Sequence, residues 1–328
     1  MIRVQHELEK RATVFNKELS QYLQGNHPQV LYEAARHLPL SGGKRLRPVL
    51  AMLSCESVGD NAALAMPFAV ALELVHNFTL VHDDIMDRSR LRRNVPTVHT
   101  KYGEPAAILA GDLLFAKSFE AMHNLRVPPQ VFKHVEFLLV KCIEDICEGQ
   151  QLDMEFEKRR HVTETEYLEM IKKKTAVLFT CATQGGAMIG GGQPKEVQAL
   201  TDYGTCLGLA FQIWDDYLDL TSNEAVLGKD IGNDIRNGKK TLIAVHALGH
   251  TSGGDKAVLD RIFGNVNASE AEVRRLLSVF RENQSIDYAK QTAQKYCEKA
   301  QRALTILRSS EAKEVLNAVA EYSIQRDK

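Results

Sequence analysis

A helical hydrophobic period runs through almost the whole chain and constrains its fold more than any other feature. Apolar residues recur at the 3.6-residue spacing of an α-helix in nearly every segment, and the sustained alternation typical of β-strands is hard to find. The pattern therefore predicts an all-α helical bundle. No internal repeat, low-complexity tract or composition shift marks a boundary, so we expect one domain over residues 1–328.

Glycine, proline and polar clusters place the ends of the expected helices. Thr163 and Glu166 form a capping-box pattern before one of them, and Pro67 is expected to kink a long apolar helix or to start its second part. A break is expected at Lys174-Thr175, and the polar loop around Lys229 is a candidate lid. The expected helices cover about residues 3–23, 29–37, 48–59, 61–87, 104–123, 129–151, 164–173, 176–189 and 194–220, followed by a helical remainder over 242–328.

Composition excludes several classes of protein. Apolar residues make up 44% and charged residues 25% of the chain, and the formal net charge is -1, which argues against a nucleic-acid or polyanionic membrane partner. The six cysteines form no CxxC pair, which favours free thiols and a cytoplasmic location. The first residues resemble neither a signal peptide nor a transit peptide, and we expect no apolar run of membrane-spanning length, hence no integral membrane segment.

Two acidic motifs of identical spacing lie far apart in the chain. They are Asp83-Asp84-Ile85-Met86-Asp87 and Asp215-Asp216-Tyr217-Leu218-Asp219. A helix turns by about 100° per residue, so the first and last aspartates of each motif share a face, roughly 6 Å apart along the axis. One such motif usually marks a solvated helix face. Two, each embedded in apolar sequence, predict carboxylates that hold Mg²⁺, with phosphate oxygens completing the octahedron of each ion.

Basic residues accompany the first motif. The loop Gly42-Gly43-Lys44-Arg45-Leu46-Arg47-Pro48 places three cations beside glycines at a helix entrance, which is typical of a diphosphate cradle but also of an ordinary basic turn. Arg92 and Arg93 follow the aspartates and can either pair with them or bind anions. His76 stands two turns before Asp83 on nearly the same face, as a ligand or as a satisfied core residue.

Together these motifs resemble those of the trans-isoprenyl diphosphate synthases, the polyprenyl synthetase family, and within it the archaeal-type short-chain members. The resemblance runs from Gly42 to about Lys240, in the family's order. It also includes Gly149-Gln150-Gln151-Leu152-Asp153, Lys174-Thr175 and the residues Phe211 to Asp219. One departure is Asn94, where the family often has glycine; asparagine tolerates a positive φ better than most residues.

The resemblance implies the isoprenoid synthase fold with a central apolar cavity, a homodimer, and about three Mg²⁺ per active site. The implied metal ligands are Asp83, Asp87 and Asp215, supported by Asp84, Asp216 and Asp219. The implied ligands of the allylic diphosphate are Arg92, Lys174, Lys229 and Lys239. The implied ligands of isopentenyl diphosphate are Lys44, Arg47, His76 and Arg93. Thr175 and Gln212 are implied to turn oxygen dipoles toward a developing carbocation, and they form the catalytic set with Lys174 and Lys229.

The expected activity is that of a trans-prenyltransferase of isoprenoid biosynthesis, which condenses isopentenyl diphosphate head-to-tail with allylic prenyl diphosphates. An aromatic residue five positions before the first aspartate, here Phe78, is understood to floor the product tunnel in archaeal-type members and to favour geranylgeranyl diphosphate (C20). The helical wheel places Thr79 closer to the side of Asp83, and a buried core phenylalanine is the plain alternative. Farnesyl (C15) and geranylfarnesyl (C25) diphosphate are the competing products.

Three other functions compete with this interpretation. A class I terpene cyclase shares the fold and one acidic motif, but its second metal motif is normally a mixed Asn/Ser/Glu pattern. A carboxylate-bridged di-iron bundle is suggested by Glu73-x-x-His76 and Glu120-x-x-His123. A non-catalytic partner subunit is the third, although such a subunit should have lost some aspartates.

Overall fold

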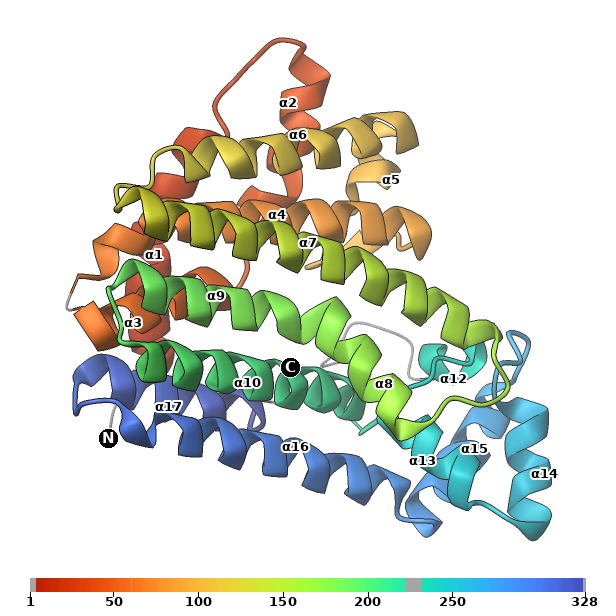
Figure 1. The fold of residues 1–328 in the computed structure, drawn as a ribbon. Helices are drawn as coiled ribbons and strands as arrows, with labels where there is room; N and C mark the ends of the chain where they lie inside the picture. The colour runs from red at the N-terminus through yellow and green to blue at the C-terminus, as the bar shows by residue number, and fades with distance from the viewer. Residues whose placement is uncertain (1–3, 60, 222–231, 327–328) are drawn as a thin grey trace. The chain divides into compact units, whose positions relative to one another are not determined.

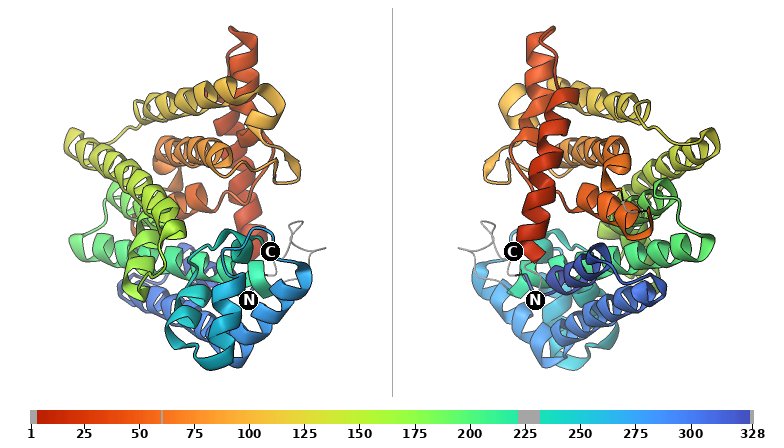
Figure 2. Two further views of the ribbon diagram at one scale, coloured as in Figure 1. Left: turned by 90° about the vertical axis from the view of Figure 1, so that its right-hand side faces the viewer. Right: turned by 90° about the vertical axis from the view of Figure 1, so that its left-hand side faces the viewer.

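The computed structural model describes all residues except 1–3, 60, 222–231 and 327–328 (Figure 1). Most of the described chain is helical, as Figure 2 also shows. The only strands among the described residues are β1, Leu91–Arg92, and β2, Val95–Pro96, which pair in antiparallel register. The all-α prediction is confirmed.

The chain divides into two compact units. The first comprises Met1–Ile143, Leu178–Thr201 and Leu304–Ala318, and the second comprises Glu144–Val177, Asp202–Ala303 and Val319–Lys328. Four helices of the described chain contribute residues to both units: α7 (Pro129–Lys158), α9 (Val177–Ile189, by its first residue only), α10 (Pro194–Thr221) and α17 (Glu311–Ser323). The one-domain organisation expected from the sequence stays a prediction.

The first unit is built around α4, which is buried on nearly all sides between Phe68 and Val75. α4 packs most extensively against α6 and also against α3. The approach to α6 is close, because a Cβ added at Gly111 would lie 2.1 Å from the His82 ring. The elements of this unit are α1 (Val4–Tyr22), α2 (Gln29–Leu40), α3 (Leu46–Gly59), η1 (Ala62–Ala65), α4 (Met66–Met86), α5 (Val98–Tyr102), α6 (Glu104–Met122), α9 (Val177–Ile189) and η3 (Leu304–Ile306).

The expectation that no apolar run reaches membrane-spanning length is wrong for one helical stretch of the first unit. By length and composition, the stretch Ala62–Met86 is apolar enough to cross a membrane, with a mean hydropathy of 1.6 over its most apolar window. Within that window, 67% of the residues are buried inside the protein. The core helix of a folded unit passes the same test of composition, because it too is surrounded by apolar atoms.

The second unit consists of shorter helices around the C-terminal half of α7 and most of α10. α13 packs against α16, and α14 packs against α15. Capping boxes start α8 at Thr163 with Glu166, as predicted, and α15 at Ser269 with Glu272. The further elements of this unit are α8 (Glu164–Ile171), η2 (Lys172–Ala176), α12 (Asn233–Asn237), α13 (Leu242–His250), α14 (Gly253–Ile262), α15 (Glu270–Glu282) and α16 (Ser285–Ala303).

Several predicted boundaries differ from the structure. α2 continues through Pro39 and ends at Leu40, although a stop before that proline was expected. α7 extends to Lys158, seven residues beyond the predicted end at Gln151. The expected break at Lys174-Thr175 is instead a π-helical turn, η2, that joins α8 to α9. Pro67 stands in the first turn of α4, after η1, so it does start the second part of the long helix.

Candidate active site

The first acidic motif lies at the C-terminal end of α4, which is the end of a helix where carboxylates are least favourable. Asp83 and Asp84 lie in its last turn and Asp87 is its C-cap, with the Asp87 backbone N–H donating to the Asp83 carbonyl at 2.8 Å. The C-terminal end of a helix carries a partial negative charge, so acidic side chains there are destabilising unless cations neutralise them. No basic residue occupies the last turn of α4 itself. The motif therefore requires positive charge from outside its helix.

Arg92, on β1, supplies part of that charge. Its Nε donates to Asp84 Oδ1 at 2.7 Å, and its Nη2 lies 3.8 Å from Asp83 Oδ2. Burial raises the pKa of Asp84, which is only 1% exposed, and the neighbouring Arg92 offsets part of that rise. Of the two possibilities for the arginine pair, Arg92 thus adopts the ion pair with the carboxylates.

The donor chemistry of this motif fits a hard divalent cation. Among the residues that the structure describes, no hydrogen-bond donor reaches Asp84 Oδ2, although this oxygen is buried. A buried carboxylate oxygen without a donor is costly, and a bound cation would satisfy it. The described residues include no group of three or more His, Cys, Asp or Glu side chains arranged to hold a metal ion by themselves. Carboxylate oxygens are the ligands that a hard divalent cation such as Mg²⁺ prefers, and such an ion usually takes further ligands from water and substrate phosphate.

A two-residue turn directs Arg92 and Arg93 toward different partners. Arg92 pairs with Val95 across the hairpin, and the turn residues Arg93 and Asn94 have φ values of 53° and 62°. Positive φ at both turn positions matches the right-handed twist of a β-hairpin, and asparagine accepts that conformation readily. The structure thus confirms that Asn94 sustains the turn. Arg93 leaves the hairpin in another direction, and its Nη1 donates to the backbone carbonyls of Leu38, at 3.3 Å, and Gly42.

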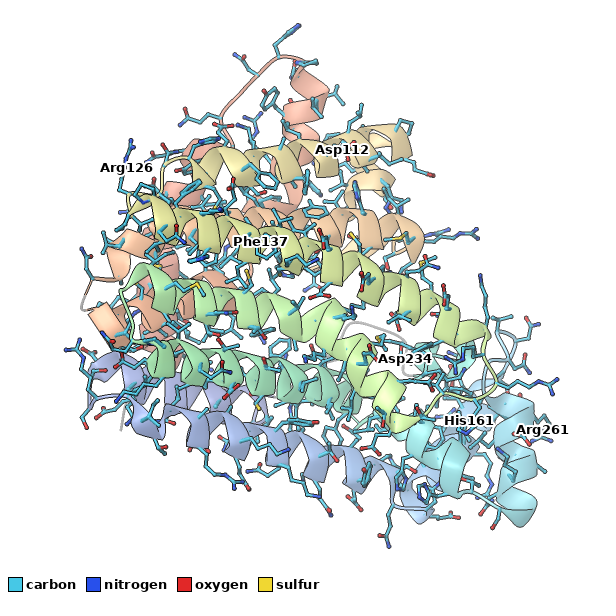
Figure 3. The ribbon with its side chains drawn as sticks, viewed as in Figure 1. Asp112, Arg126, Phe137, His161, Asp234 and Arg261 are labelled. Atoms are coloured by element: carbon cyan, nitrogen blue, oxygen red, sulfur yellow. The ribbon has the colours of Figure 1, made fainter. Side chains whose placement is uncertain are left out.

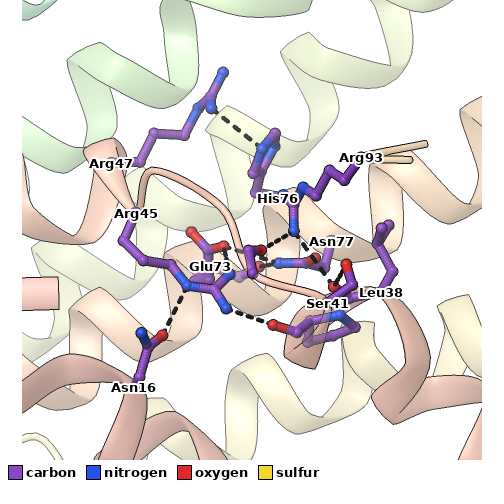
Figure 4. Close-up of polar contacts among 11 residues, drawn as sticks. Asn16, Leu38, Ser41, Arg45, Arg47, Glu73, His76, Asn77 and Arg93 are labelled. Carbon is purple, nitrogen blue, oxygen red and sulfur yellow. Dashed lines mark hydrogen bonds and ion pairs between the residues drawn. The ribbon is translucent and has the colours of Figure 1, made fainter. Parts of the chain in front are cut away.

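The first unit also gathers three of the four predicted ligands of isopentenyl diphosphate. Arg47 Nη1 lies 3.2 Å from His76 Nε2, and the two side chains point toward one another beside Arg93 in Figure 4. Burial lowers the pKa of His76 well below its usual value, and Arg47 and Arg93 lower it further. A neutral His76 accepts the Arg47 hydrogen bond at Nε2. It adds no positive charge beside Arg47 and Arg93. Lys44, the fourth residue, is exposed on the loop between α2 and α3.

In the second unit, the π-helical turn positions Lys174 and Thr175. Lys174 Nζ lies 2.5 Å from Asp153 Oδ2, which gives the Gly149 to Asp153 motif on α7 a partner in this unit. Thr175 Oγ1 donates to Gln212 Oε1 on α10 at 2.8 Å. Single π turns occur frequently at functional sites, because the extra residue redirects the side chains that follow. Two predicted catalytic residues, Thr175 and Gln212, are therefore joined directly.

Gln212 extends this contact to the second acidic motif. Its Nε2 donates to Asp216 Oδ1 at 3.0 Å, while the hydroxyl of Tyr167 donates to Asp216 Oδ2 at 2.8 Å. Lys239 Nζ lies 3.9 Å from Asp216 Oδ1 and 3.5 Å from Asp234 Oδ2. Burial raises the pKa of Asp216 to about 7, although Lys239 lowers it. Burial lowers the pKa of Lys239, but Asp234 and Asp216 raise it more, so its net pKa lies well above the ordinary value.

The remaining aspartates of the second motif stand in different surroundings. Asp215 is 37% exposed at its side chain, and its Oδ1 lies 2.6 Å from Nη2 of Arg326. The Arg326 guanidinium stacks over the Phe211 ring, 3.8 Å from the centroid. Asp219 is half-buried in the last turn of α10. Lys229, predicted to bind the allylic diphosphate, lies outside the described residues.

Phe78 and Thr79, the predicted chain-length residues, lie on α4 in the first unit. The Phe78 ring is 9% exposed and meets the Phe115 ring edge-on, with centroids 5.4 Å apart, and the His82 ring at 6.0 Å. Thr79 Oγ1 donates to the His76 carbonyl at 2.8 Å. Their role in setting product length stays a prediction.

The structure contradicts the di-iron alternative in the first unit. Glu73 forms a buried ion pair with Arg45, and His76 faces Arg47. Glu120 is 59% exposed at its side chain and pairs with Lys117, while His123 is exposed. Carboxylates that already neutralise basic side chains, or that face solvent, do not form the inward-facing ligand set of a di-iron centre.

Sequence reasoning missed three residues of these networks: Arg45, Tyr167 and Arg326. From the sequence, Arg45 is only one more cation of the basic loop, whereas in the structure it is 4% exposed. Tyr167 lies 49 residues from Asp216 in the chain, so no local pattern joins them. The glycines and cations around Arg45 are the only local signal, and they are as typical of a basic turn as of a diphosphate cradle.

An all-α fold in which both aspartate motifs end helices beside basic side chains defines a transferase of the isoprenoid synthase class. A family model described as polyprenyl synthetase matches residues 28–280. Geranylgeranyl diphosphate synthase of Methanosarcina mazei is 44% identical over 322 residues, which cover 98% of this chain and 97% of that protein. Geranylfarnesyl diphosphate synthase of Natronomonas pharaonis is 37% identical over 341 residues and 98% of each chain. The crystal structure of geranylgeranyl pyrophosphate synthetase from Pyrococcus horikoshii is 43% identical, with a TM-score of 0.94 over 98% of both chains.

The chain therefore belongs to the polyprenyl synthetase family. Its fold is that of the all-α isoprenoid synthases, and it is a prenyltransferase of isoprenoid biosynthesis. This assignment favours the prediction made from the motifs over a terpene cyclase or a di-iron bundle.

Proposed function

We propose that this enzyme condenses isopentenyl diphosphate with allylic diphosphates and releases geranylgeranyl diphosphate as its main product. The observation that carries this proposal is the completeness of the two aspartate motifs, each with basic side chains beside it in its own unit. The C20 product is supported by the high identity to a geranylgeranyl diphosphate synthase over the full chain. The geranylfarnesyl diphosphate synthase among the relatives makes C25 the alternative to be tested.

The six aspartates are proposed to hold Mg²⁺, with Asp83, Asp87 and Asp215 as direct ligands and Asp84, Asp216 and Asp219 in support. When bound, Mg²⁺ would neutralise negative charge on the diphosphate leaving group. The 2.7 Å ion pair with Asp84 fixes the Arg92 guanidinium beside the first motif, which supports a role for Arg92 in binding the allylic diphosphate. Lys174 and Lys239 are proposed to bind the same diphosphate, and Lys229 with them.

The proposed reaction balances without an acid or base from the protein. The allylic C–O bond breaks, and its electron pair leaves with the diphosphate. The isopentenyl double bond attacks the allylic carbocation, a new C–C bond forms, and a proton passes to the released pyrophosphate. Thr175 and Gln212, joined at 2.8 Å, direct oxygen dipoles toward the positive charge that develops on carbon. Lys44, Arg47, His76 and Arg93 are proposed to hold the diphosphate of isopentenyl diphosphate.

A chain-elongation assay tests the activity and its product together. The purified protein is incubated with isopentenyl diphosphate, Mg²⁺ and each allylic diphosphate from C5 to C15, and the dephosphorylated alcohols are then sized. We expect the C20 alcohol to predominate and activity to disappear with excess chelator. A main product of C15 or C25 would overturn the assignment of chain length, and no elongation from any starter would overturn the proposed reaction.

We also propose a homodimer in the cytoplasm. α6 exposes Ile108, Leu109 and Phe115, and the first part of α7 exposes Phe137, which is 64% exposed (Figure 3). Several large apolar side chains exposed on neighbouring segments are typical of association surfaces. The cysteines of the described chain are all free, which suits a reducing compartment.

The dimer is tested by light scattering after size-exclusion chromatography. Phe137→Lys is expected to shift the mass toward the monomer, whereas Val266→Lys, at an exposed apolar residue of the second unit, is expected to leave it unchanged. A monomeric parent protein would contradict the proposal.

A further inference from the structure

Arg45 is buried in a strained backbone conformation that the proposed chemistry does not explain. Its φ is +49°, in the left-handed region that a residue with a Cβ seldom adopts, and its side chain is only 2% exposed. Such strain persists when surrounding contacts over-determine the conformation, and it is often found at ligand-binding sites. Arg45 lies between Lys44 and Arg47, two of the predicted ligands of isopentenyl diphosphate.

Each nitrogen of the Arg45 guanidinium contacts a different helix. Nε donates to Asn16 Oδ1 on α1 at 2.8 Å, Nη1 donates to Glu73 Oε1 on α4 at 2.6 Å, and Nη2 donates to the Pro39 carbonyl on α2 (Figure 4). The planar fork of an arginine fixes all three directions at once. Arg45 therefore ties the basic loop to three helices of the first unit, and all three nitrogens are engaged away from Lys44.

Glu73 is fixed as firmly as its partner. Asn77, one turn later on α4, donates from Nδ2 to Glu73 Oε1 at 3.1 Å and to the Glu73 carbonyl at 2.7 Å. The Glu73 side chain is 3% exposed. A buried ion pair adds little net stability, because desolvation cancels most of the attraction. Its value here lies in fixing one arrangement of the loop rather than in stabilising the fold.

Arg93 holds the same loop from its other side. Its guanidinium donates to the Gly42 carbonyl, and a Cβ added at Gly43 would lie 3.0 Å from Arg93 Cζ. Arg45 and Arg93 thus bracket Gly42 and Gly43, and the residues that follow enter α3 with a defined direction. Arg47, in the first turn of α3, then meets His76 at 3.2 Å.

We propose that Arg45 and Glu73 are positioning residues for the isopentenyl diphosphate subsite. They set the affinity for that diphosphate through Lys44, Arg47 and Arg93 and do not touch the substrate themselves. This inference rests on the proposed function. It predicts that loss of the pair weakens the binding of isopentenyl diphosphate but not that of the allylic diphosphate. A merely structural role would not produce this selectivity.

The central test replaces both members of the pair, as Arg45→Met with Glu73→Met. Removing both charges together leaves no unpaired buried ion, so the variant is expected to fold with a thermal midpoint close to the parent. We expect the KM for isopentenyl diphosphate to rise about tenfold or more, because a small misplacement of binding groups is costly. The KM for the allylic substrate and kcat are expected to stay within about twofold.

A conservative variant and a matched control narrow the interpretation. Arg45→Lys keeps a charge opposite Glu73 but loses the fork, so its KM for isopentenyl diphosphate should lie between those of the parent and the double variant. Arg11 and Glu56 form a second ion pair of the first unit, between α1 and α3, with Arg11 Nη2 3.1 Å from Glu56 Oε2. Arg11→Met with Glu56→Met is expected to leave the KM for isopentenyl diphosphate unchanged.

Calorimetric titration of each folded variant with isopentenyl diphosphate alone provides a readout independent of turnover. A tenfold weaker affinity in the Arg45/Glu73 variant supports the proposal. An active parent together with an unchanged affinity in that variant would overturn it. A parent that neither binds nor elongates isopentenyl diphosphate would instead refute the proposed function on which the inference depends.

Discussion

The hydroxyl of Tyr167 donates to Asp216 Oδ2 at 2.8 Å, and both side chains are buried. Because Gln212 occupies the other oxygen at 3.0 Å, the Asp216 carboxylate is held by two neutral donors from α8 and α10. These donors orient the carboxylate and add no charge of their own, so the positive charge beside Asp216 comes from Lys239, whose Nζ lies 3.9 Å from Oδ1. This arrangement is suited to the support of a metal ion and explains why a tyrosine is buried beside an aspartate.

Replacing Tyr167 with phenylalanine should therefore lower the affinity of the enzyme for Mg²⁺. Loss of the orienting hydrogen bond is expected to raise the Mg²⁺ concentration for half-maximal activity about tenfold, in line with losses of partners that orient metal ligands. The measurement is a Mg²⁺ titration of the elongation rate. Tyr288→Phe removes another hydroxyl of the second unit, one that donates to Glu164 at 2.8 Å and 2.9 Å, and should leave the titration unchanged. Equal shifts in both variants would contradict the role of Tyr167.

Two glycines, one on α7 and one on α10, allow these helices to pack closely against the π-helical turn. A Cβ added at Gly149 would lie 2.3 Å from the Lys174 backbone nitrogen, and one at Gly208 would lie 2.5 Å from the Ala176 Cα. Because the obstructing atoms are backbone, Gly149→Ala and Gly208→Ala should each force the turn apart. We expect a loss of unfolding free energy of about 1–3 kcal/mol and a marked fall in kcat.

Gly249 offers the matched control for these substitutions. It lies in α13, and no atom within 4 Å would meet a Cβ added there. Gly249→Ala is expected to leave kcat unchanged and to raise stability by up to about 1 kcal/mol, because alanine is the better helix former. Denaturant unfolding and steady-state kinetics check both expectations. A tolerant Gly149→Ala variant would show that the π turn adapts.

The sequence predicts those parts of the structure that depend on local patterns. Helical periodicity located the helices that carry Asp83 and Asp215, and the Thr163–Glu166 box was readable because both partners lie within one turn. The π turn at Lys174 was not readable, since one extra residue in a helix changes the hydrogen-bond register without changing composition. The hairpin at Arg92 was missed because two-residue strands are too short to show alternation.

Partners that are distant in sequence lay beyond such reasoning. Arg326 lies 111 residues after Asp215 in the chain, yet the two side chains meet at 2.6 Å, because both residues belong to the second compact unit. The sequence offers Arg45 only as a cation of the basic loop, whereas in the structure it is paired with Glu73. Long-range packing decides which charge of a basic cluster turns inward, and no spacing rule encodes that choice.

His76 should contribute a stability that is lost on acidification. Its pKa in the folded protein is lowered by burial and by Arg47 and Arg93, whereas the unfolded value is about 6.5. The unfolded state therefore binds more protons, so stability is complete above about pH 6.5 and falls as the pH decreases toward the folded pKa. At pH 5 the loss reaches at most about 2 kcal/mol.

Denaturant unfolding between pH 7.5 and pH 5 measures this contribution as a difference between variants. The parent should lose more stability over that range than His76→Gln, whose amide cannot take up a proton but can still accept from Arg47. Parallel pH profiles of the two proteins would instead show that His76 titrates in the folded protein with its ordinary pKa.

Phe78 provides the last prediction, which concerns product length. Its ring is almost fully buried and packs edge-on against Phe115. Phe78→Ala would therefore leave an empty space between α4 and α6. If Phe78 floors the product tunnel, the variant should elongate beyond C20, to C25 or longer, as sized by chromatography of the alcohols. Phe68→Ala removes a fully buried ring from the same helix, where the ring packs against Gly185, and should destabilise the fold without lengthening the product. An unchanged C20 product from a folded Phe78→Ala variant would mean that this ring serves only the core, and that another residue sets the length.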